Sequence, residues 1–108
     1  HSAVIRERVA GAREVQSHRL AGTRMVTNSE MGPLEVRRYC QELLVPDAQP
    51  LLAGAMEQLA LSARAFHRVL KVARTIADLA GAEDIATPHL TEALGYRRMD
   101  RGQGQQAA

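Results

Sequence analysis

The 108-residue sequence contains a single cysteine, no tryptophan, one phenylalanine and two tyrosines. One cysteine excludes an internal disulfide and a cysteine-rich zinc site. Two tyrosines are too few for a platform on which the bases of single-stranded nucleic acid could stack. No apolar run approaches the roughly 20 residues that a membrane-spanning helix needs, and no secretory signal is visible. We therefore expect a cytoplasmic location and no membrane partner.

The sequence also lacks the patterns of recognisable catalytic sites. It contains no G-x-x-x-x-G-K-[ST] phosphate loop and no glycine-rich dinucleotide motif. His18, His67 and His89 have neither a carboxylate nor a second histidine at metal-ligand spacing, so solvated or partly buried side chains are predicted. Cys40 lies on an apolar-leaning segment and is predicted to be a small core residue. No catalytic residue and no metal ligand is predicted in this chain.

The charges are nearly balanced. Fourteen Lys and Arg face twelve Asp and Glu, a net charge of +2, and thirteen of the fourteen cations are arginine. The planar fork of arginine suits carboxylate and phosphate, which indicates an anionic partner. The acids are interleaved with the bases, however, whereas nucleic-acid-binding domains usually carry a stronger and clustered excess of positive charge.

Helix-forming residues are abundant, while β-branched and aromatic strand formers are sparse. Apolar spacing and helix start and stop signals predict helices over about 2–20, 33–44, 48–60, 62–80 and 87–98. Residues 22–32, with glycine at both ends and polar residues between, predict a flexible loop. The apolar-poor tail 101–108 is predicted to be disordered. The predicted fold class is all-α, a small bundle of about five helices whose main body covers 33–100.

Several polar residues are placed to define helix ends. Asp47 precedes the third predicted helix and Ser62 precedes the fourth, each with a side chain that can cap an N-terminus. Thr87 followed by Pro88 predicts the start of the fifth helix. Gly81 is predicted to end the fourth.

The most regular helical pattern is LSARAFHRVLKVARTIADLAG, residues 61–81. At about 100° per residue, its apolar side chains spread over one broad side. Arg64, Arg68 and Lys71 fall on the opposite side, with Arg74 at its edge. Such a row is ordinarily a solvated face. Arg74 precedes Asp78 by four residues and can pair with it, so a solvated face accounts for Lys71 and Arg74.

Arg64 needs a different explanation, because it is the second residue after the Ser62 cap. The N-terminus of a helix is already positive, so a cation there gains little from its own helix. An external anion would be favoured both by the arginine and by the backbone amides of the same turn. The position of Arg64 therefore predicts contact with an anion.

RRYCQELL at 37–44 and AMEQLALSARAFHRVLKVARTIADLAGAEDIATPHLTEALGYRRMD at 55–100 resemble the C-terminal region of the magnesium-chelatase-related AAA+ ATPases, especially the competence-protein type. The opening SAVIRERVAGAREVQ resembles the segment that leaves the ATPase core, and residues 1–21 would have that role. The resemblance implies the helical lid of a longer protein, of which this chain is a fragment. ATP and Mg²⁺ would be held by an upstream core domain. Neighbouring subunits of a homo-oligomeric ring, and DNA, would be further partners.

The same resemblance gives Arg64 a role. In related lids, a Ser-x-Arg pattern near the start of this helix carries the sensor-2 arginine, which contacts the γ-phosphate of ATP, and residues 62–64 match that pattern. Arg68, one turn along, is the second candidate. Ala60 stands where similar sequences often have glycine. The implied function is a lid for ATP hydrolysis during DNA remodelling in competence or recombination. The fragment alone would bind no cofactor and would not be an enzyme.

Two other interpretations remain open at this point. The chain can be a free-standing helical module that binds nucleic acid or protein through its arginine-rich faces, or a structural bundle without a site. Steeply salt-dependent DNA binding would favour the free-standing module. The output of the longer protein is also open, because magnesium chelatases insert metal into a porphyrin whereas the competence type is linked to DNA.

Overall fold

A computed structural model describes the backbone of residues 2–107 and the side chains of residues 2–97. Its α-helices are α1 (Ser2–Arg19), α2 (Pro33–Val36), α3 (Gln49–Gln58), α4 (Ala63–Leu79) and α5 (Thr87–Ala107). Two 3₁₀ turns, η1 (Asn28–Glu30) and η3 (Pro46–Ala48), and one π-helical segment, η2 (Arg37–Gln41), lie between them. The described backbone contains no strand, only an isolated bridge between Leu44 and Ile85. The all-α prediction is confirmed.

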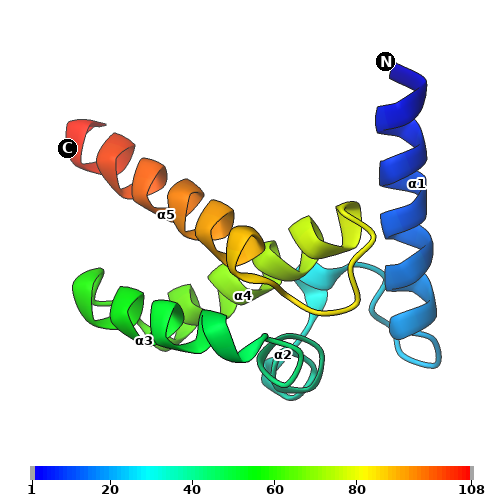
Figure 1. Cartoon of the computed structure of the whole chain (residues 1–108), viewed down its shortest axis with the longest axis horizontal. Coiled ribbons are helices and arrows are strands. Elements are labelled where there is room, and N and C mark those ends of the chain that lie inside the picture. The colour runs from blue at the N-terminus through cyan, green and yellow to red at the C-terminus, as the bar shows by residue number, and fades with distance from the viewer. Residues whose placement is uncertain (1, 108) are drawn as a thin grey trace.

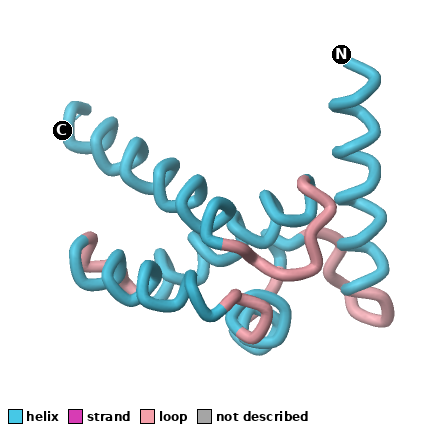
Figure 2. The backbone as a smooth tube through the Cα atoms, viewed as in Figure 1, coloured by secondary structure: helices cyan, strands magenta, loops and turns pink. Residues whose placement is uncertain are grey.

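Helix α4 organises the fold. It contacts α1, α2 and α5 as well as η1 and η2. Figure 1 shows α1 standing beside the end of α4, away from the free ends of α3 and α5. The tube in Figure 2 shows how little of the chain is loop, with the longest connections after α1 and before α5. The backbone of α5 continues through most of the 101–108 tail. The side chains of this tail lie outside the described residues, and the disorder expected from its composition stays a prediction.

The core is built from apolar side chains on one side of α4 and the elements that cover it. Leu90, Ala93 and Leu94 of α5 are buried, as their helical spacing predicts. Cys40 is also fully buried, which confirms it as a core residue. The other large core side chains are Leu20, Met31, Val36, Leu44, Leu52, Val69, Leu70 and Ile85. Burial of each of these side chains contributes roughly 1.5–3 kcal/mol before the entropy of folding is subtracted.

Helix α1 buries only two described residues, Ala12 and Gln16, and both lie in its second half. Helical spacing places Ile5, Val9 and Ala12 on one apolar stripe, yet only Ala12 is buried, and Ile5 is 51% exposed. The reason is tertiary: α1 meets the end of α4 and extends beyond it. The N-terminal half of α1 therefore presents apolar side chains to solvent.

The second predicted helix is not a uniform α-helix. Pro33 begins α2, and the chain then widens into the π-helical segment η2, where the Glu42 amide donates to the Arg37 carbonyl at 3.0 Å. Single turns of π-helix interrupt regular hydrogen bonding and are often found at functional sites. Here the Tyr39 carbonyl accepts a hydrogen bond from the Arg74 side chain, at 3.3 Å. A contact with α4 thus accompanies the irregular turn.

Of the predicted caps, Ser62 is confirmed, since the Ala65 amide donates to its hydroxyl at 3.1 Å. The predicted Asp47 cap is wrong. The 3₁₀ turn η3 forms first, and the N-cap of α3 is Ala48. A cap at Thr87 would make Pro88 the first helical residue, whereas α5 already includes Thr87. At this end the Ala86 amide donates to Nδ1 of His89, at 2.9 Å, which occupies a donor that the helix leaves free.

Helices α3 and α4 end in the same way. One residue after each C-cap has a positive φ, +48° for Ala60 and +73° for Gly81. The amides of that residue and the next donate back to carbonyls of the last helical turn, at 2.9 to 3.3 Å. Glycine adopts this left-handed conformation without steric cost, whereas alanine does not. Gly81 ends α4 as predicted, and Ala60 carries strain at the corresponding position of α3.

We expect Ala60→Gly to raise the free energy of unfolding by about 0.5–1 kcal/mol. Removing the Cβ from a left-handed residue relieves roughly 1–2 kcal/mol of strain in the folded state. The greater flexibility of glycine stabilises the unfolded chain and offsets part of that gain. Urea unfolding measures the change. Gly81→Ala is the matched reverse variant: a Cβ there meets nothing within 4 Å, so only backbone strain is added and stability should fall. A less stable Ala60→Gly variant would contradict this account.

Candidate anion-binding site

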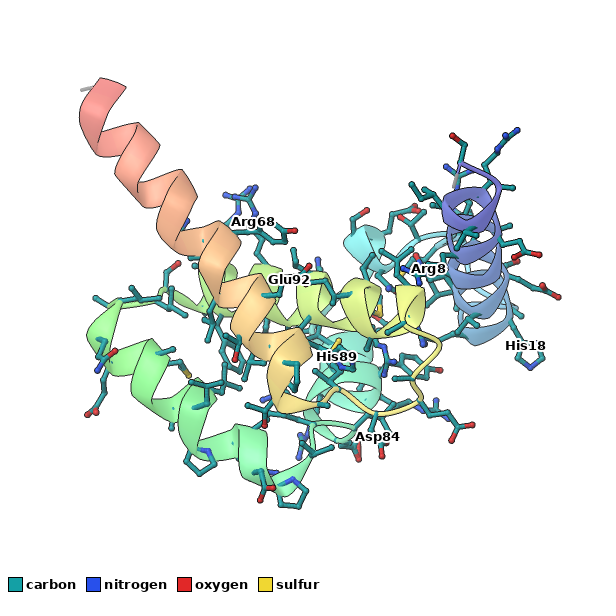
Figure 3. All side chains as sticks on the ribbon, turned by 45° about the horizontal axis from the view of Figure 1, so that its top comes forward. Arg8, His18, Arg68, Asp84, His89 and Glu92 are labelled. Carbon is teal, nitrogen blue, oxygen red and sulfur yellow. The ribbon has the colours of Figure 1, made fainter. Side chains whose placement is uncertain are left out.

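A groove of about 400 Å³ lies between the exposed side of α4 and the segment that leads into α2. It is lined by Met31, Pro33, Arg64, His67, Arg68 and Lys71. Its polar walls are thus three cations and an imidazole, and no carboxylate is among the described residues that line it. In Figure 3 the Arg68 side chain extends from the ribbon of α4 toward solvent. The structure therefore brings Arg64 and Arg68, the two residues singled out by the sequence, into one cationic groove.

Arg64 and Arg68 form no ion pair with any residue whose side chain the structure describes. Arg64 is the second residue of α4, directly after the Ser62 cap, and both arginines are exposed. Within the described part of the chain, the ion pairs involve Arg19, Arg74 and Asp78 but neither of these two arginines. Two unpaired cations beside a helix N-terminus generate a positive potential that an external anion would relieve.

Lys71, the third cation of the groove, also contacts the turn η1. It is half-buried, and its Nζ donates to the Ser29 carbonyl of η1 at 3.1 Å. An ammonium group has three donors, so two remain for another acceptor. A solvated face describes Lys71 only in part, because its ammonium also contacts η1, against which α4 packs.

Arg74 is fully buried, so the prediction of a solvated side chain is wrong. Its predicted pairing with Asp78 is confirmed, with Nε donating to Oδ1 at 3.1 Å. Its other donors reach the carbonyls of Tyr39, Ala82 and Glu83. Burial lowers the pKa of the guanidinium, and the charge of Asp78 opposes that shift. Arg74 is therefore a structural residue that ties α4 to η2 and to the segment after α4.

Asp78 also receives two groups from distant parts of the chain. Arg19 donates to both of its carboxylate oxygens, at 2.8 and 2.9 Å. The side-chain amide of Asn28 donates to Oδ2 of Asp78 at 2.9 Å. Arg19 in turn donates to Oδ1 of Asn28, at 2.9 Å. We call Arg19, Asn28, Arg74 and Asp78 the buried network. It joins α1, η1 and α4, and sequence reasoning missed Arg19 and Asn28 because they lie 59 and 50 residues from Asp78.

The segment predicted as a flexible loop, 22–32, contains the ordered turn η1. Asn28 and Met31 anchor it, with 1% and 2% of their surface exposed. Glu30 caps the turn, since its Oε1 accepts from the Val26 and Thr27 amides at 3.1 and 3.0 Å. The turn forms one wall of the groove through Met31. Mobility of the remaining loop residues stays a prediction.

The capping bonds of Glu30 make the turn sensitive to acid. Hydrogen bonds from the Thr27 and Val26 amides stabilise the carboxylate and lower the pKa of Glu30 below 4.5. A lowered folded-state pKa contributes stability that is present above 4.5 and is lost as the pH falls through the folded value. We expect the Val26 and Thr27 amide resonances to shift with a midpoint below pH 4.5, and Glu30→Gln to abolish the transition. A midpoint at or above 4.5 would contradict the capping role.

Other chemistry is limited in the described residues. No group of three or more His, Cys, Asp and Glu side chains there is arranged to hold a metal ion. Burial raises the pKa of the Cys40 thiol to about 11, so this thiol stays protonated at neutral pH. No helix among the described residues combines the length and the apolar character needed to cross a membrane. Among the described residues, the cationic groove offers the charges that would bind an anion.

The chain is similar to known bacterial proteins along most of its length. It is 48% identical over 100 residues to Competence protein ComM of Haemophilus influenzae, covering 93% of this chain and 18% of that protein. It is 40% identical over 100 residues to the YifB proteins of Salmonella typhimurium and Escherichia coli, covering 93% of this chain and 19% of each relative. The chain therefore spans less than a fifth of the length of these relatives.

A family model described as magnesium chelatase, subunit ChlI C-terminal, matches residues 1–97. This range includes α1, the buried network and every residue of the groove. The relatives and the family model agree with the resemblance found in the sequence patterns. The chain belongs to the family of magnesium chelatase, subunit ChlI, C-terminal domains.

Proposed function

We propose that this domain is the helical lid of a magnesium-chelatase-like AAA+ ATPase, and that Arg64 is its sensor-2 arginine. ATP and Mg²⁺ would be held by a core domain elsewhere in the longer protein. The main support is the position of Arg64 in the first turn of α4, at a groove shared with Arg68. Its guanidinium is exposed and forms no ion pair with a described residue, and the described lining of the groove includes no carboxylate. Family membership supports the lid assignment.

The chemistry follows from charge. As the bond to the γ-phosphate breaks, negative charge shifts among the phosphate oxygens, and a cation already in place lowers the energy of that transition state. Arg64 would contact the γ-phosphate, and Arg68, one helical turn away, would add to the positive potential. Departure of the phosphate removes the contact, which frees the lid to rotate and to move its neighbours in a ring of subunits.

The exposed half of α1 supplies a surface for the upstream core domain. Ile5 and Val9 line an apolar groove of about 370 Å³ together with Ile76 and Leu79 of α4. Contiguous exposed apolar surface is typical of interaction sites. In this proposal the core domain of the same polypeptide packs against this groove. The buried network holds α1 to α4, and it would transmit movement of the core domain to the rest of the lid.

The assembled protein would be a homo-oligomeric ring that remodels DNA during competence or recombination. This part of the proposal rests on similarity to a relative named Competence protein ComM. In this proposal the lid contacts nucleotide rather than the final substrate, so it does not determine which substrate the longer protein acts on.

ATP hydrolysis by the full-length protein tests the proposal. Replacement of Arg64 by alanine should lower turnover while the protein remains folded and assembled. Normal turnover in a folded Arg64→Ala protein would rule out the sensor-2 role. Tight DNA binding by the present chain alone, independent of ATP and steeply salt-sensitive, would instead favour a free-standing binding module.

A further inference from the structure

Lys71 is the cation of the groove that the sensor-2 assignment leaves unused. Its ammonium is held by the Ser29 carbonyl, and Ser29 belongs to η1. That turn is rigidly attached, because the neighbouring Asn28 is buried and bonded to Asp78, at 2.9 Å, and to Thr75, at 3.0 Å. This hydrogen bond places the Lys71 ammonium at the groove wall without a ligand, which reduces the side-chain entropy to be lost on binding.

The carboxylates nearest in sequence to the groove wall do not neutralise it. Glu30 and Glu35 flank the wall residues Met31 and Pro33. Glu30 accepts from the Val26 and Thr27 amides, as described, and Glu35 accepts from the Gly32 amide at 2.9 Å. Both acids accept from backbone amides, and neither forms an ion pair with a described cation of the groove.

We propose that Lys71 is a further anion-binding residue and that the groove accepts a chain of phosphates rather than a single one. One phosphoryl group lies at Arg64 and Arg68, and the next lies at Lys71. From Arg64 to Lys71 the helix rises about 10 Å, so the three cations form a row longer than a single phosphate ion. This inference rests on the proposed function, because it places the phosphates of the same nucleotide in the same groove.

Equilibrium binding of ATP to the full-length protein is the test, with sodium tripolyphosphate and orthophosphate as competitors. Lys71→Met keeps the apolar stem but removes the charge and its donors. We expect it to weaken ATP binding about 10-fold, as for loss of one charge-assisted hydrogen bond. Competition by tripolyphosphate should weaken in parallel, while orthophosphate, which the two arginines can hold alone, should compete as before.

Two further variants separate binding from structure. Lys71→Arg keeps a cation near Ser29 and should restore affinity to within about 3-fold. Arg13→Met, an exposed arginine on α1 outside the groove, should leave ATP and tripolyphosphate binding unchanged. If Lys71 has a purely structural role, the Lys71→Met protein should instead bind tripolyphosphate and orthophosphate more weakly by the same factor.

The outcomes distinguish this inference from the sensor-2 assignment. If Arg64→Ala impairs ATP binding or hydrolysis and Lys71→Met leaves tripolyphosphate binding unchanged, Lys71 has no ligand role and the sensor-2 assignment stands. If Lys71→Met weakens binding while Arg64→Ala changes neither binding nor turnover, the polyphosphate contact stands and the sensor-2 assignment falls. No effect from either variant overturns both.

Discussion

Asp78→Ala is expected to destabilise the domain by about 3–5 kcal/mol, the range measured when one partner of a buried ion pair is removed. Two cations depend on this carboxylate. Arg74 is fully buried against it, and Arg19, with only 10% of its side chain exposed, donates to both of its oxygens. Removing the acid leaves both guanidinium groups without their counter-charge in a place that water reaches poorly. Small domains are stable by about 5–15 kcal/mol, so the loss would be a large fraction of the total.

Chemical denaturation of this chain measures the effect, with circular dichroism reporting helix content. Asp84→Ala is the matched control: the same substitution, six residues along, at an exposed position on the segment before α5 (Figure 3). Its effect should stay within about 0.5 kcal/mol. Asp78→Asn tests the origin of the loss, because it keeps the shape and one acceptor but removes the charge. A change below 1 kcal/mol for Asp78→Ala would show that water reaches the network and screens it.

Arg64→Ala is expected to lower the ATP turnover of the full-length protein on the order of 100-fold, the cost typical of removing one group that stabilises charge in a transition state. Stability should change by less than about 0.5 kcal/mol, because the side chain is exposed and pairs with no described residue. An unfolding curve that matches the wild type, together with greatly reduced turnover, would separate a functional contact from a structural one.

Steady-state kinetics shows what kind of contact Arg64 makes. A fall in kcat with little change in KM indicates an interaction made in the transition state, whereas a rise in KM alone indicates uniform binding of nucleotide. Arg37→Ala, an exposed arginine outside the groove, is the control and should retain turnover. Arg68→Ala should have a smaller effect than Arg64→Ala. Equal effects for Arg37 and Arg64 would indicate a general dependence on charge rather than a specific contact.

Local sequence signals predicted much of the fold. The helix of residues 61–81 was recognised from its apolar period, its Ser62 cap and its terminal Gly81, all of which act within a few residues of one another. Cys40 and the inward side of α5 were also predicted correctly, because burial of apolar side chains follows helical spacing. Arg64 stood out for the same local reason, its place in the first helical turn.

Two predictions were wrong for different reasons, one local and one tertiary. Asp47 precedes α3 within capping range, but a 3₁₀ turn formed before the helix and moved its start. Ile5 and Val9 have helical spacing and yet stay exposed, since α1 extends beyond the end of α4. Periodicity states which side chains share a side of a helix, but not whether another element covers that side.

Residues 64–74 of α4 show the division between the two levels most clearly. The sequence by itself determined that these residues form a helix, that one side is apolar, and that Arg64 occupies an unfavourable end for a cation. Only the tertiary structure decided that Arg74 is a buried structural residue and that Lys71 is held by η1 beside the groove. The physical reason is that a charged side chain can be solvated or paired in the interior, and distant segments supply the carboxylate and carbonyl groups that allow the second outcome.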